Sequence, residues 1–556
     1  MRFTGNSTGR IRLAALLAAA LLMTPLCGFA SSASAIPTYM RVGMVSPKTE
    51  TLHPLTVMNR DLISVLDLVY ESLVELNDDQ EPVPSLAESW EVQGGGKTWI
   101  FHIRDGVYFH DGRKLTAYDV KATMDVIKQL AESGSANNEK GIYWLMAGSD
   151  SVSGVLTSWE AEDNLTLRVQ TSRPYYGVLY AMTFPIIQAQ SAYDENPPGT
   201  GPYRVDYYTP GEKLALTANL NWWGQTPYVS SIDAICYKTD EEALQAFEAE
   251  EIDILATRST TAVRYRGVIS NRINSYDYGT RQLECLMINN GASKLNDQKM
   301  RRAIMSAINK SRLVTSVYQG IVTTTDTLQI PGTWLYKDPD KLSDGYRYGY
   351  DPNRANALLD ELGWDQYDDN GYRCKMTDSG RQTLTFRLNY YNESGNALRK
   401  EAALEIQTML KAVGIKTTVS AYSFENGQAK LKSGDYDLFL CAYNFDVTPD
   451  PTFCLLSNGY GNYARYRSDA MSKLLTALRK APTVETDENG NETTPLLTLL
   501  KNKFQQDWYA IQDQMAEDGP FMPLYWRNGV VLTRYPYSSV RDIREFELLN
   551  SIESYR

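Results

Sequence analysis

Residues 84–120 read PSLAESWEVQGGGKTWIFHIRDGVYFHDGRKLTAYDV, and this stretch decides the fold prediction. Two short β-prone runs, 99–104 and 107–110, flank the dipeptide Asp105-Gly106. This dipeptide is typical of two-residue hairpin turns because glycine tolerates a positive φ. The stretch therefore predicts two antiparallel strands joined at Asp105-Gly106.

A helix is predicted directly after this strand pair. Thr116 can accept a hydrogen bond from a free amide of the first turn, while Asp119 reaches back and favours the positive end of the helix. Gly94-Gly95-Gly96 lacks the lysine and the following helix of a phosphate loop, so we interpret it as a turn.

The same stretch closely resembles the signature region of the family 5 extracellular solute-binding proteins, the dipeptide- and oligopeptide-binding components of ABC importers. Their pattern reads P-x-LAESW … F-x-LR-x-GV-x-FHDG-x-x-LTA-x-DV. The resemblance continues in collinear order through five further segments, at 198–224, 251–254, 297–310, 351–364 and 519–532. It implies a two-lobe, periplasmic-binding-protein-like α/β fold of class II, with mixed sheets flanked by helices and a hinge between the lobes.

The resemblance also implies domain boundaries. Lobe I is expected at 36–59, 191–283 and 519–556, with an extra subdomain at 60–190, and lobe II at 284–518.

Strand and helix signals alternate along the rest of the chain, which favours α/β construction. Strands are predicted at 38–45, 415–422 and 435–443, and two more strands within 198–224 are joined at Pro210-Gly211. Helices are predicted at 61–76 and 297–318, from Pro352 to Gly363, and before Gly414. A surface loop is predicted at 483–495.

The first 35 residues have the features of a signal peptide. Three arginines precede an apolar run at 13–23, and Ala33-Ser34-Ala35 forms a cleavage signal. The run is too short to span a bilayer, so we expect export rather than a transmembrane anchor. The mature protein is then extracytoplasmic, in the periplasm or on the outer face of the cell membrane.

Cys27 offers an alternative cleavage site. The segment Thr24-Pro25-Leu26-Cys27 loosely resembles a lipoprotein box, although Leu26 occupies a position where Gly, Ala or Ser is usual. Lipidation at Cys27 would tether the protein to a membrane surface, whereas cleavage at Ala35 discards this cysteine.

Charge excludes one class of partner. Residues 36–556 carry 52 basic and 67 acidic side chains, a net charge of −15. Nucleic acid is not an expected partner, because phosphate binding needs a basic surface. The resemblance instead implies a small peptide ligand, ABC permease membrane subunits as partners, and a monomer.

The five cysteines outside the first 35 residues indicate no disulfide framework. They are Cys236, Cys285, Cys374, Cys441 and Cys454, an odd number without C-x-x-C spacing. Buried free thiols are expected, with Cys441 and Cys454 as the one candidate pair.

Catalytic motifs are absent from the sequence. The three histidines are His53, His102 and His110, and none has the spacing of a metalloprotease or a nucleophile elbow. The predicted hairpin would make His102 and His110 diagonal neighbours, so a metal site with Asp111 is an alternative to structural roles. We predict no enzyme activity, no cofactor and no resident metal.

Aromatic residues are abundant, with 37 tyrosines and 10 tryptophans. Their rings supply large rigid contact areas with a polar edge, as suits a binding cleft. This richness does not separate a peptide binder from a sugar binder.

The segment LCAYNFDVTPDPTFCLL at 440–456 carries the predicted ligand site. Peptide-binding relatives have W-x-A-D-Y-x-x-P here, and its aspartate meets the α-ammonium of the ligand. Alignment on Pro451 puts Val447 at the aspartate position, so Asp446 is the favoured carboxylate and Asp450 the second choice. The structural alternative is that Asp446 caps a turn.

Other predicted site residues follow from the same resemblance. Tyr443, Asn444 and Phe445 would line this wall, Met58 and Arg60 the wall across the cleft, and Trp526 and Arg527 the hinge side, where Arg527 could meet a carboxylate.

These features together predict an extracytoplasmic substrate-binding protein that captures short peptides between two lobes for a permease. The alternative within the fold is capture of nickel, a metal chelate or an oligosaccharide, which the departure at Val447 keeps open. A secreted glycoside hydrolase with two carboxylates is the alternative from another class.

Overall fold

A computed structural model describes residues 38–45, 51–133, 146, 154–265, 273–338, 340, 349–392, 397–485, 493–535, 544–545 and 547–549. The predicted signal peptide, Cys27 and part of the predicted loop at 483–495 lie outside these residues.

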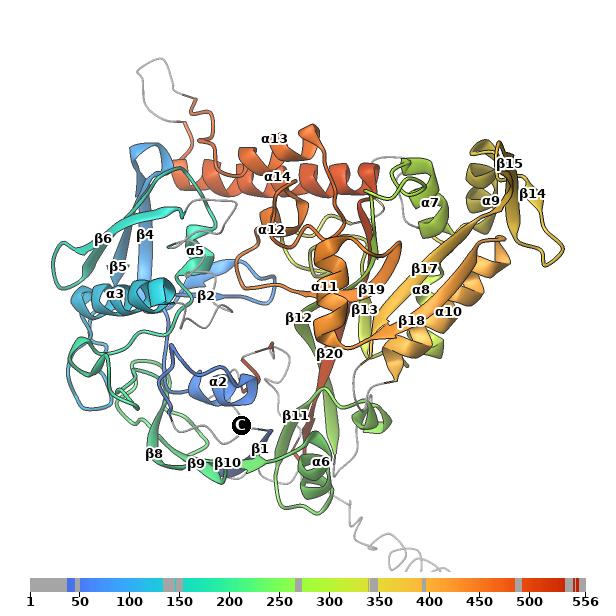
Figure 1. Cartoon of the computed structure of the whole chain (residues 1–556). Coiled ribbons are helices and arrows are strands. Elements are labelled where there is room, and N and C mark those ends of the chain that lie inside the picture. Colours follow the sequence, from blue (N-terminus) through green and yellow to red (C-terminus); the bar gives the residue numbers. More distant parts are fainter. Residues whose placement is uncertain are drawn as a thin grey trace, which may run out of the picture. The chain divides into compact units, whose positions relative to one another are not determined.

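One large mixed sheet runs through the described chain (Figure 1). Its strand order is β18-β17-β19-β12-β20-β11-β1-β10-β9-β8, and β13 also pairs with β20. The strands are β1 (Tyr39–Val45), β8 (Tyr203–Thr209), β9 (Lys213–Ala218), β10 (Ser231–Tyr237), β11 (Ile254–Thr257), β12 (Asn274–Ile288), β13 (Val322–Thr324), β17 (Thr385–Tyr391), β18 (Lys416–Tyr422), β19 (Leu438–Asn444) and β20 (Phe521–Thr533).

Two long antiparallel strands, β12 and β20, join the two halves of this sheet. Residues 274–279 of β12 pair with 528–533 of β20, next to β11. Residues 283–287 pair with 521–526 of β20 and, on their other edge, with β19. The register shifts between Gly279 and Leu283, so the ladder is interrupted where one half of the sheet passes into the other.

The half that contains β17, β18 and β19 is built from parallel strands with helical crossovers. Helix α10 (Leu398–Ala412) connects β17 to β18, and α11 (Phe424–Ser433) connects β18 to β19. Both helices flank these strands in Figure 1. The core between them is apolar and includes Ile406, Leu410 and Leu440. This arrangement agrees with the helix, Gly414 and strand predicted in this region.

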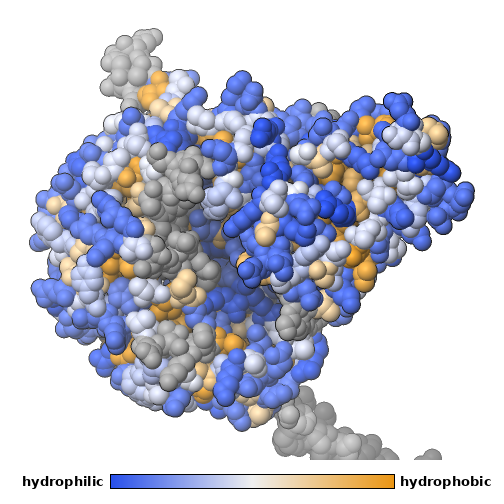
Figure 2. All heavy atoms as spheres, viewed as in Figure 1, coloured by the Kyte–Doolittle hydropathy of each residue, from blue (hydrophilic) through white to orange (hydrophobic). Residues whose placement is uncertain are grey.

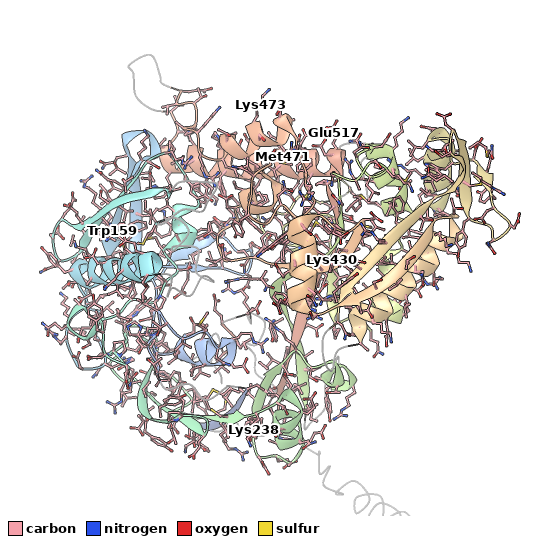
Figure 3. The ribbon with its side chains drawn as sticks, viewed as in Figure 1. Trp159, Lys238, Lys430, Met471, Lys473 and Glu517 are labelled. Atoms are coloured by element: carbon pink, nitrogen blue, oxygen red, sulfur yellow. The ribbon has the colours of Figure 1, made fainter. Side chains whose placement is uncertain are left out.

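A smaller four-stranded antiparallel sheet has the order β4-β5-β7-β6 and is covered by α3 (Ala117–Ser133). Its strands are β4 (Ala87–Gln93), β5 (Thr98–Ile103), β6 (Leu156–Ala161) and β7 (Thr166–Thr171). Trp159 of β6, labelled in Figure 3, donates through Nε1 to Asp125 of α3 at 2.8 Å. A polar contact thus adds to the packing of helix on sheet.

The hairpin predicted at Asp105-Gly106 is wrong. Gly106 has a φ of +80°, so a turn forms there, but β5 pairs with β4 and β7 and leaves no edge for residues 107–110. His102 therefore lies opposite Ser89 and Thr166. The predicted cross-strand neighbourhood of His102 and His110 does not exist.

The start of α3 was predicted in part. Asp119 does reach back, and its Oδ2 accepts from the amide of Thr116 at 2.9 Å. The Thr116 hydroxyl donates to the same oxygen at 2.8 Å instead of accepting from the helix.

Two predicted helices are shorter than expected. Helix α2 (Arg60–Leu66) ends well before Leu76. The residues that follow it contact a distant loop instead, because the carbonyl of Val69 accepts from the amide of Gly201 at 3.0 Å. The helix predicted at 297–318 is two helices, α7 (Gln298–Ser306) and α8 (Lys310–Ser316). Asn309 separates them, since its side chain caps α8.

Other predictions are confirmed. The strand at 38–45 is β1, the strands joined at Pro210-Gly211 are β8 and β9, and Pro352 opens a helix that Gly363 follows at a φ of +75°.

The remaining elements are β2 (Val74–Leu76), β3 (Pro82–Pro84), β14 (Gln366–Tyr367), β15 (Arg373–Thr377), β16 (Gly380–Thr383), α5 (Val178–Ala181), α6 (Asp240–Glu248), α9 (Pro352–Glu361), α12 (Thr452–Leu455), α13 (Asp469–Ala477), α14 (Leu496–Asp518) and 3₁₀ turns at 94–96, 189–191 and 260–265.

The five described cysteines are free thiols, and all but Cys236 are buried. The candidate pair Cys441 and Cys454 is therefore not a disulfide. Among the described helices, none combines the length and apolar character needed to cross a membrane.

Candidate functional site

A narrow cavity brings together three of the predicted site residues, Phe445, Asp446 and Trp526. The loop after β19 supplies the first two, and β20 supplies the third. The cavity has a water-accessible volume of about 60 Å³, enough for a few water molecules. The face of the molecule in Figure 2 is hollowed, and hydrophilic side chains predominate among the described residues around the hollow.

Asp446 is the carboxylate of this cavity. Its Oδ1 accepts from the amide of Thr448 at 2.6 Å, and among the described residues it forms no ion pair. Burial raises the pKa of Asp446 to about 7, although the Thr448 amide and the Arg281 charge oppose the shift. The turn-capping contact of the structural alternative is thus present, and the second carboxylate oxygen accepts no hydrogen bond from the described residues.

Asp450 lies four residues further on and is fully engaged inside the protein. It forms a buried ion pair with Arg479, accepts from the Tyr175 hydroxyl at 3.1 Å and accepts from the Thr452 amide at 2.9 Å. Asp450 and its three partners are all buried. The Asp450 carboxylate therefore holds the loop after β19 against the segments that contain Arg479 and Tyr175.

Aromatic rings form the wall beside Asp446. Phe445 lies 5.5 Å from Trp526, measured between ring centroids, and Trp526 donates through Nε1 to the carbonyl of Gln329 at 3.2 Å. Tyr443 points away from the cavity: it is buried and its hydroxyl donates to the carbonyl of Gly461 at 2.6 Å. Asn444 is exposed and does not line the cavity.

Arg527 belongs to a charged network next to the cavity. Glu284 lies between Arg399, at 2.6 Å, and Arg527, at 3.4 Å. Burial alone would raise the pKa of Glu284, but the two guanidinium groups hold it below its usual range.

Met58 and Arg60 are not among the residues that line the cavity. Met58 is 71% exposed, and Arg60 forms an ion pair with Asp61 at 3.0 Å. Burial of Arg60 is outweighed by the neighbouring Asp61, so its pKa is raised.

Most of the other lining residues were not predicted, among them Gln80, Tyr180, Arg281 and Trp334. The indole Nε1 of Trp334 donates to the Tyr180 hydroxyl at 2.6 Å and to the carbonyl of Gln80 at 3.2 Å. Trp334 lies in an irregular segment, so no periodic pattern in the sequence indicates it. Arg281 lies within the register shift of β12, between Gly279 and Leu283, which the sequence does not reveal either.

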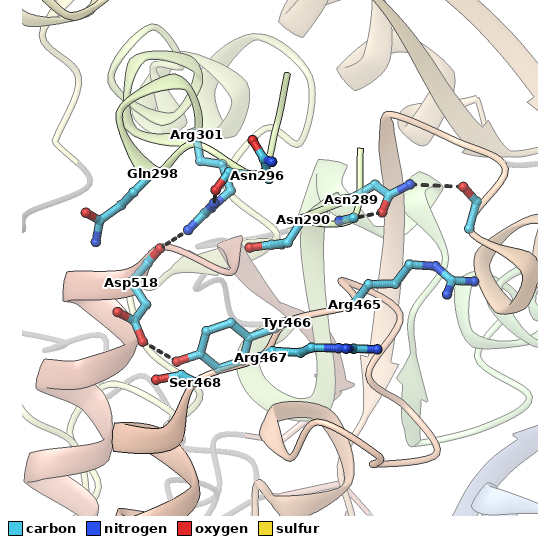
Figure 4. A pocket seen from close by; sticks show the side chains of 12 residues that line it. Asn289, Asn290, Asn296, Gln298, Arg301, Arg465, Tyr466, Arg467, Ser468 and Asp518 are labelled. Carbon is cyan, nitrogen blue, oxygen red and sulfur yellow. Dashed lines mark hydrogen bonds between the residues drawn. The ribbon is translucent and has the colours of Figure 1, made fainter. Parts of the chain in front are cut away.

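A second pocket, of about 780 Å³, lies near the ends of β12 and α14 (Figure 4). Its buried polar groups are satisfied within the protein. Arg301 donates to the carbonyls of Leu295, Asp518 and Gly519, and Asn290 to those of Ala464 and Pro520. We interpret these contacts as a polar junction that holds chain segments together.

Metal ligands do not cluster in the described part of the chain: no group of three His, Cys, Asp or Glu residues there could hold an ion. His110 contacts the carbonyl of Gly201 at 3.0 Å through Nε2, and Asp111 accepts from Gln188 at 2.9 Å. The alternative site of His102, His110 and Asp111 thus has no geometric support.

Comparison with known families gives one match over most of the chain. Residues 81–465 match the model of the bacterial extracellular solute-binding proteins, family 5 middle region.

Curated relatives include binders of different solutes. The chain is 24% identical to the oligopeptide-binding protein AppA of Bacillus subtilis, over 86% of both chains. It is 26% identical to the dipeptide-binding protein of Escherichia coli, over 72% of this chain and 75% of that one. It is 24% identical to the nickel-binding periplasmic protein of Escherichia coli, over 67% of this chain and 69% of that one.

A crystal structure of a putative peptide binding protein, AppA from Clostridium difficile, is similar in fold. The TM-score is 0.72 at 19% identity, over 93% of this chain and 99% of that chain. This similarity confirms the predicted fold class.

Proposed function

Because the chain belongs to the bacterial extracellular solute-binding proteins of family 5, we propose that it captures short peptides and delivers them to the permease of an ABC transporter. The amino end of the peptide would enter the cavity lined by Phe445, Asp446 and Trp526, and the peptide would later be released to the membrane subunits. No bond is made or broken in this cycle, and the protein acts as a monomer outside the cytoplasm.

Asp446 is the observation that supports a peptide ligand. It is a partly buried carboxylate that forms no ion pair with the described residues, and desolvation raises its pKa to about 7 although the Arg281 charge opposes the shift. The α-ammonium of a peptide would supply the missing charge in a charge-assisted hydrogen bond. The Asp450 carboxylate, by contrast, already has Arg479.

Closure of two lobes would complete the site. We keep the boundaries 36–59, 191–283 and 519–556 for lobe I, 60–190 for its subdomain and 284–518 for lobe II. A ligand that contacts both lobes only when they close shifts the population towards the closed state. The register shift of β12 near Gly279 is a suitable place for the bending, because the ladder is already interrupted there.

Export of the protein and its anchoring to a membrane are proposed from the sequence of the first 35 residues. Residues 1–35 would direct secretion, with cleavage after Ala35 or, in a lipid-anchored form, before Cys27.

The experiment is calorimetric titration of the mature chain with short peptides, combined with native mass spectrometry of co-purified ligand. Binding of tri- to pentapeptides at micromolar affinity or better is expected, and Asp446→Asn should weaken it at least tenfold. Asp378→Asn, at an exposed aspartate in the turn between β15 and β16, is the matched control and should bind as the wild type does.

Other results would reject the proposal. A co-purified metal chelate or oligosaccharide together with no peptide binding would assign the alternative ligand within this family. Conversion of the bound solute into a product would contradict a binding protein altogether.

A further inference from the structure

We propose that Tyr460 is a specificity residue: its exposed ring forms a stacking platform for an aromatic side chain near the amino end of the bound peptide. This inference rests on the proposed function, because it places the peptide amine at Asp446.

Tyr460 ends a ladder of rings that begins inside the cavity. Trp526 and Phe445 are 5.5 Å apart, Phe445 and Phe453 are 5.4 Å apart, and Phe453 and Tyr460 are 5.5 Å apart. The last two rings are nearly parallel, at an interplanar angle of 29°. Tyr460 therefore has one face on Phe453, while 59% of the residue remains exposed.

The ring contacts bring Tyr460 near the predicted anchor, because Phe453 connects it to Phe445, the residue directly before Asp446. The pKa of Tyr460 is raised to about 12, chiefly by desolvation of its hydroxyl and next by the Asp446 charge. An amine held at Asp446 would bring the first side chains of a peptide beside this ring.

The backbone holds Tyr460 in place through a tight turn. Gly459 and Gly461 flank it, and a Cβ on Gly459 would lie 2.3 Å from the carbonyl oxygen of Phe453. The amide of Gly461 donates to that same oxygen at 2.9 Å, and the side chain of Asn462 donates to the carbonyl of Leu456 at 3.0 Å. An exposed ring fixed in this way loses little freedom when a ligand stacks on it.

An aromatic side chain is the ligand group that suits this platform. A tyrosine face accepts an offset-stacked or edge-on ring, and such aromatic pairs correspond to about a three- to tenfold gain in affinity. A methyl side chain covers far less of the ring.

The test compares two peptides, Phe-Ala-Ala-Ala and Ala-Ala-Ala-Ala, by calorimetric titration of the mature wild-type chain. The wild type should bind the first about tenfold more tightly. Tyr460→Ala should reduce that ratio to about twofold or less, mainly by weakening the phenylalanine peptide, and Tyr460→Phe should retain the ratio. Tyr193→Ala, at a tyrosine that is 77% exposed and bonded to Gln129, is the control and should also retain it.

Three outcomes would overturn the inference. Equal affinity of the wild type for both peptides would show that no aromatic preference exists, and an unchanged ratio in Tyr460→Ala would place the preference elsewhere. Binding of neither peptide to the wild type would reject the proposed function and this inference together. Thermal unfolding at the wild-type temperature would verify that Tyr460→Ala is folded, as expected for an exposed ring.

Discussion

Asp446 and Asp450 lie four residues apart on one loop, yet only Asp450 has its charge neutralised by a cation in an ion pair within the described protein. Arg479 pairs with Asp450, whereas the hydrogen bond that Asp446 accepts from the described residues comes from the Thr448 amide. Two similar carboxylates thus have separate uses: one holds the loop to its neighbours, and the other remains available to a cationic ligand group.

Removal of the Asp450 charge should destabilise the protein. In Asp450→Asn, the buried Arg479 loses its counter-ion, and the free energy of unfolding should fall by about 3 kcal/mol, the usual effect of leaving one buried charge uncompensated. Urea denaturation followed by circular dichroism measures this change. The double variant Asp450→Asn with Arg479→Met should recover part of the loss, and equal stability of Asp450→Asn and the wild type would contradict a structural role.

Ligand affinity should depend on pH through Asp446. With a pKa of about 7, the carboxyl group is mostly neutral at pH 5.5 and charged at pH 7.5, so peptide affinity should rise over that range. Titration calorimetry at both pH values should show about a tenfold difference in the wild type. The same difference in Asp446→Asn would exclude Asp446 as the titrating group.

Glu71 should titrate near neutrality inside the fold. It accepts from the indole nitrogens of Trp222 and Trp223, both at 3.0 Å, and burial raises its pKa to about 7 despite these bonds. Tryptophan fluorescence should therefore change with a midpoint near pH 7. In Glu71→Gln this transition should disappear, while the fluorescence of the unfolded chain stays the same.

Glu71 should also make the free energy of unfolding fall as the pH rises. Because its folded pKa lies above the unfolded value of about 4.3, the folded state binds more protons between these values. Its contribution to the free energy of unfolding is greatest below about pH 4 and is lost as the pH rises through 7. Urea denaturation at pH 5 and pH 8 should show a smaller difference in Glu71→Gln than in the wild type.

Gly529 should not accept a larger side chain. A Cβ there would lie 2.1 Å from the ring of Tyr278, which is buried against it on β12. Gly529→Ala should lower the unfolding free energy by about 2 kcal/mol, since overpacking forces side chains and backbone to move. Gly106→Ala, where no atom lies within 4 Å, is an instructive comparison: any loss there would come from its φ of +80°.

Local signals in the sequence predicted the elements that depend on local chemistry. Pro352 and Gly363 bound a helix, and Pro210-Gly211 joins two strands, because these residues restrict or permit particular backbone angles. The hairpin at Asp105-Gly106 failed for a tertiary reason: β7, some 60 residues further along, takes the edge of β5.

The candidate site was predictable only where a motif marked it. The family resemblance indicated Phe445, Asp446 and Trp526, and the structure brings them into one cavity. Trp334 and Tyr180 could not be found in this way, since their approach depends on contacts between segments about 150 residues apart. Tyr443 was expected at the cavity, but its ring is buried and its hydroxyl donates to the carbonyl of Gly461, a contact with a distant loop that the motif does not reveal.

The central position of β20 has a consequence for the newly made chain. This strand comes from the last 40 residues, yet it lies between β12 and β11 and also pairs with β13. Until it has been synthesised, the edges of β11 and β12 that it will cover remain without their partner. Folding of the central sheet can therefore be completed only after residues 521–533 have been made, so the segments synthesised earlier must wait for this strand before the two halves of the sheet can join.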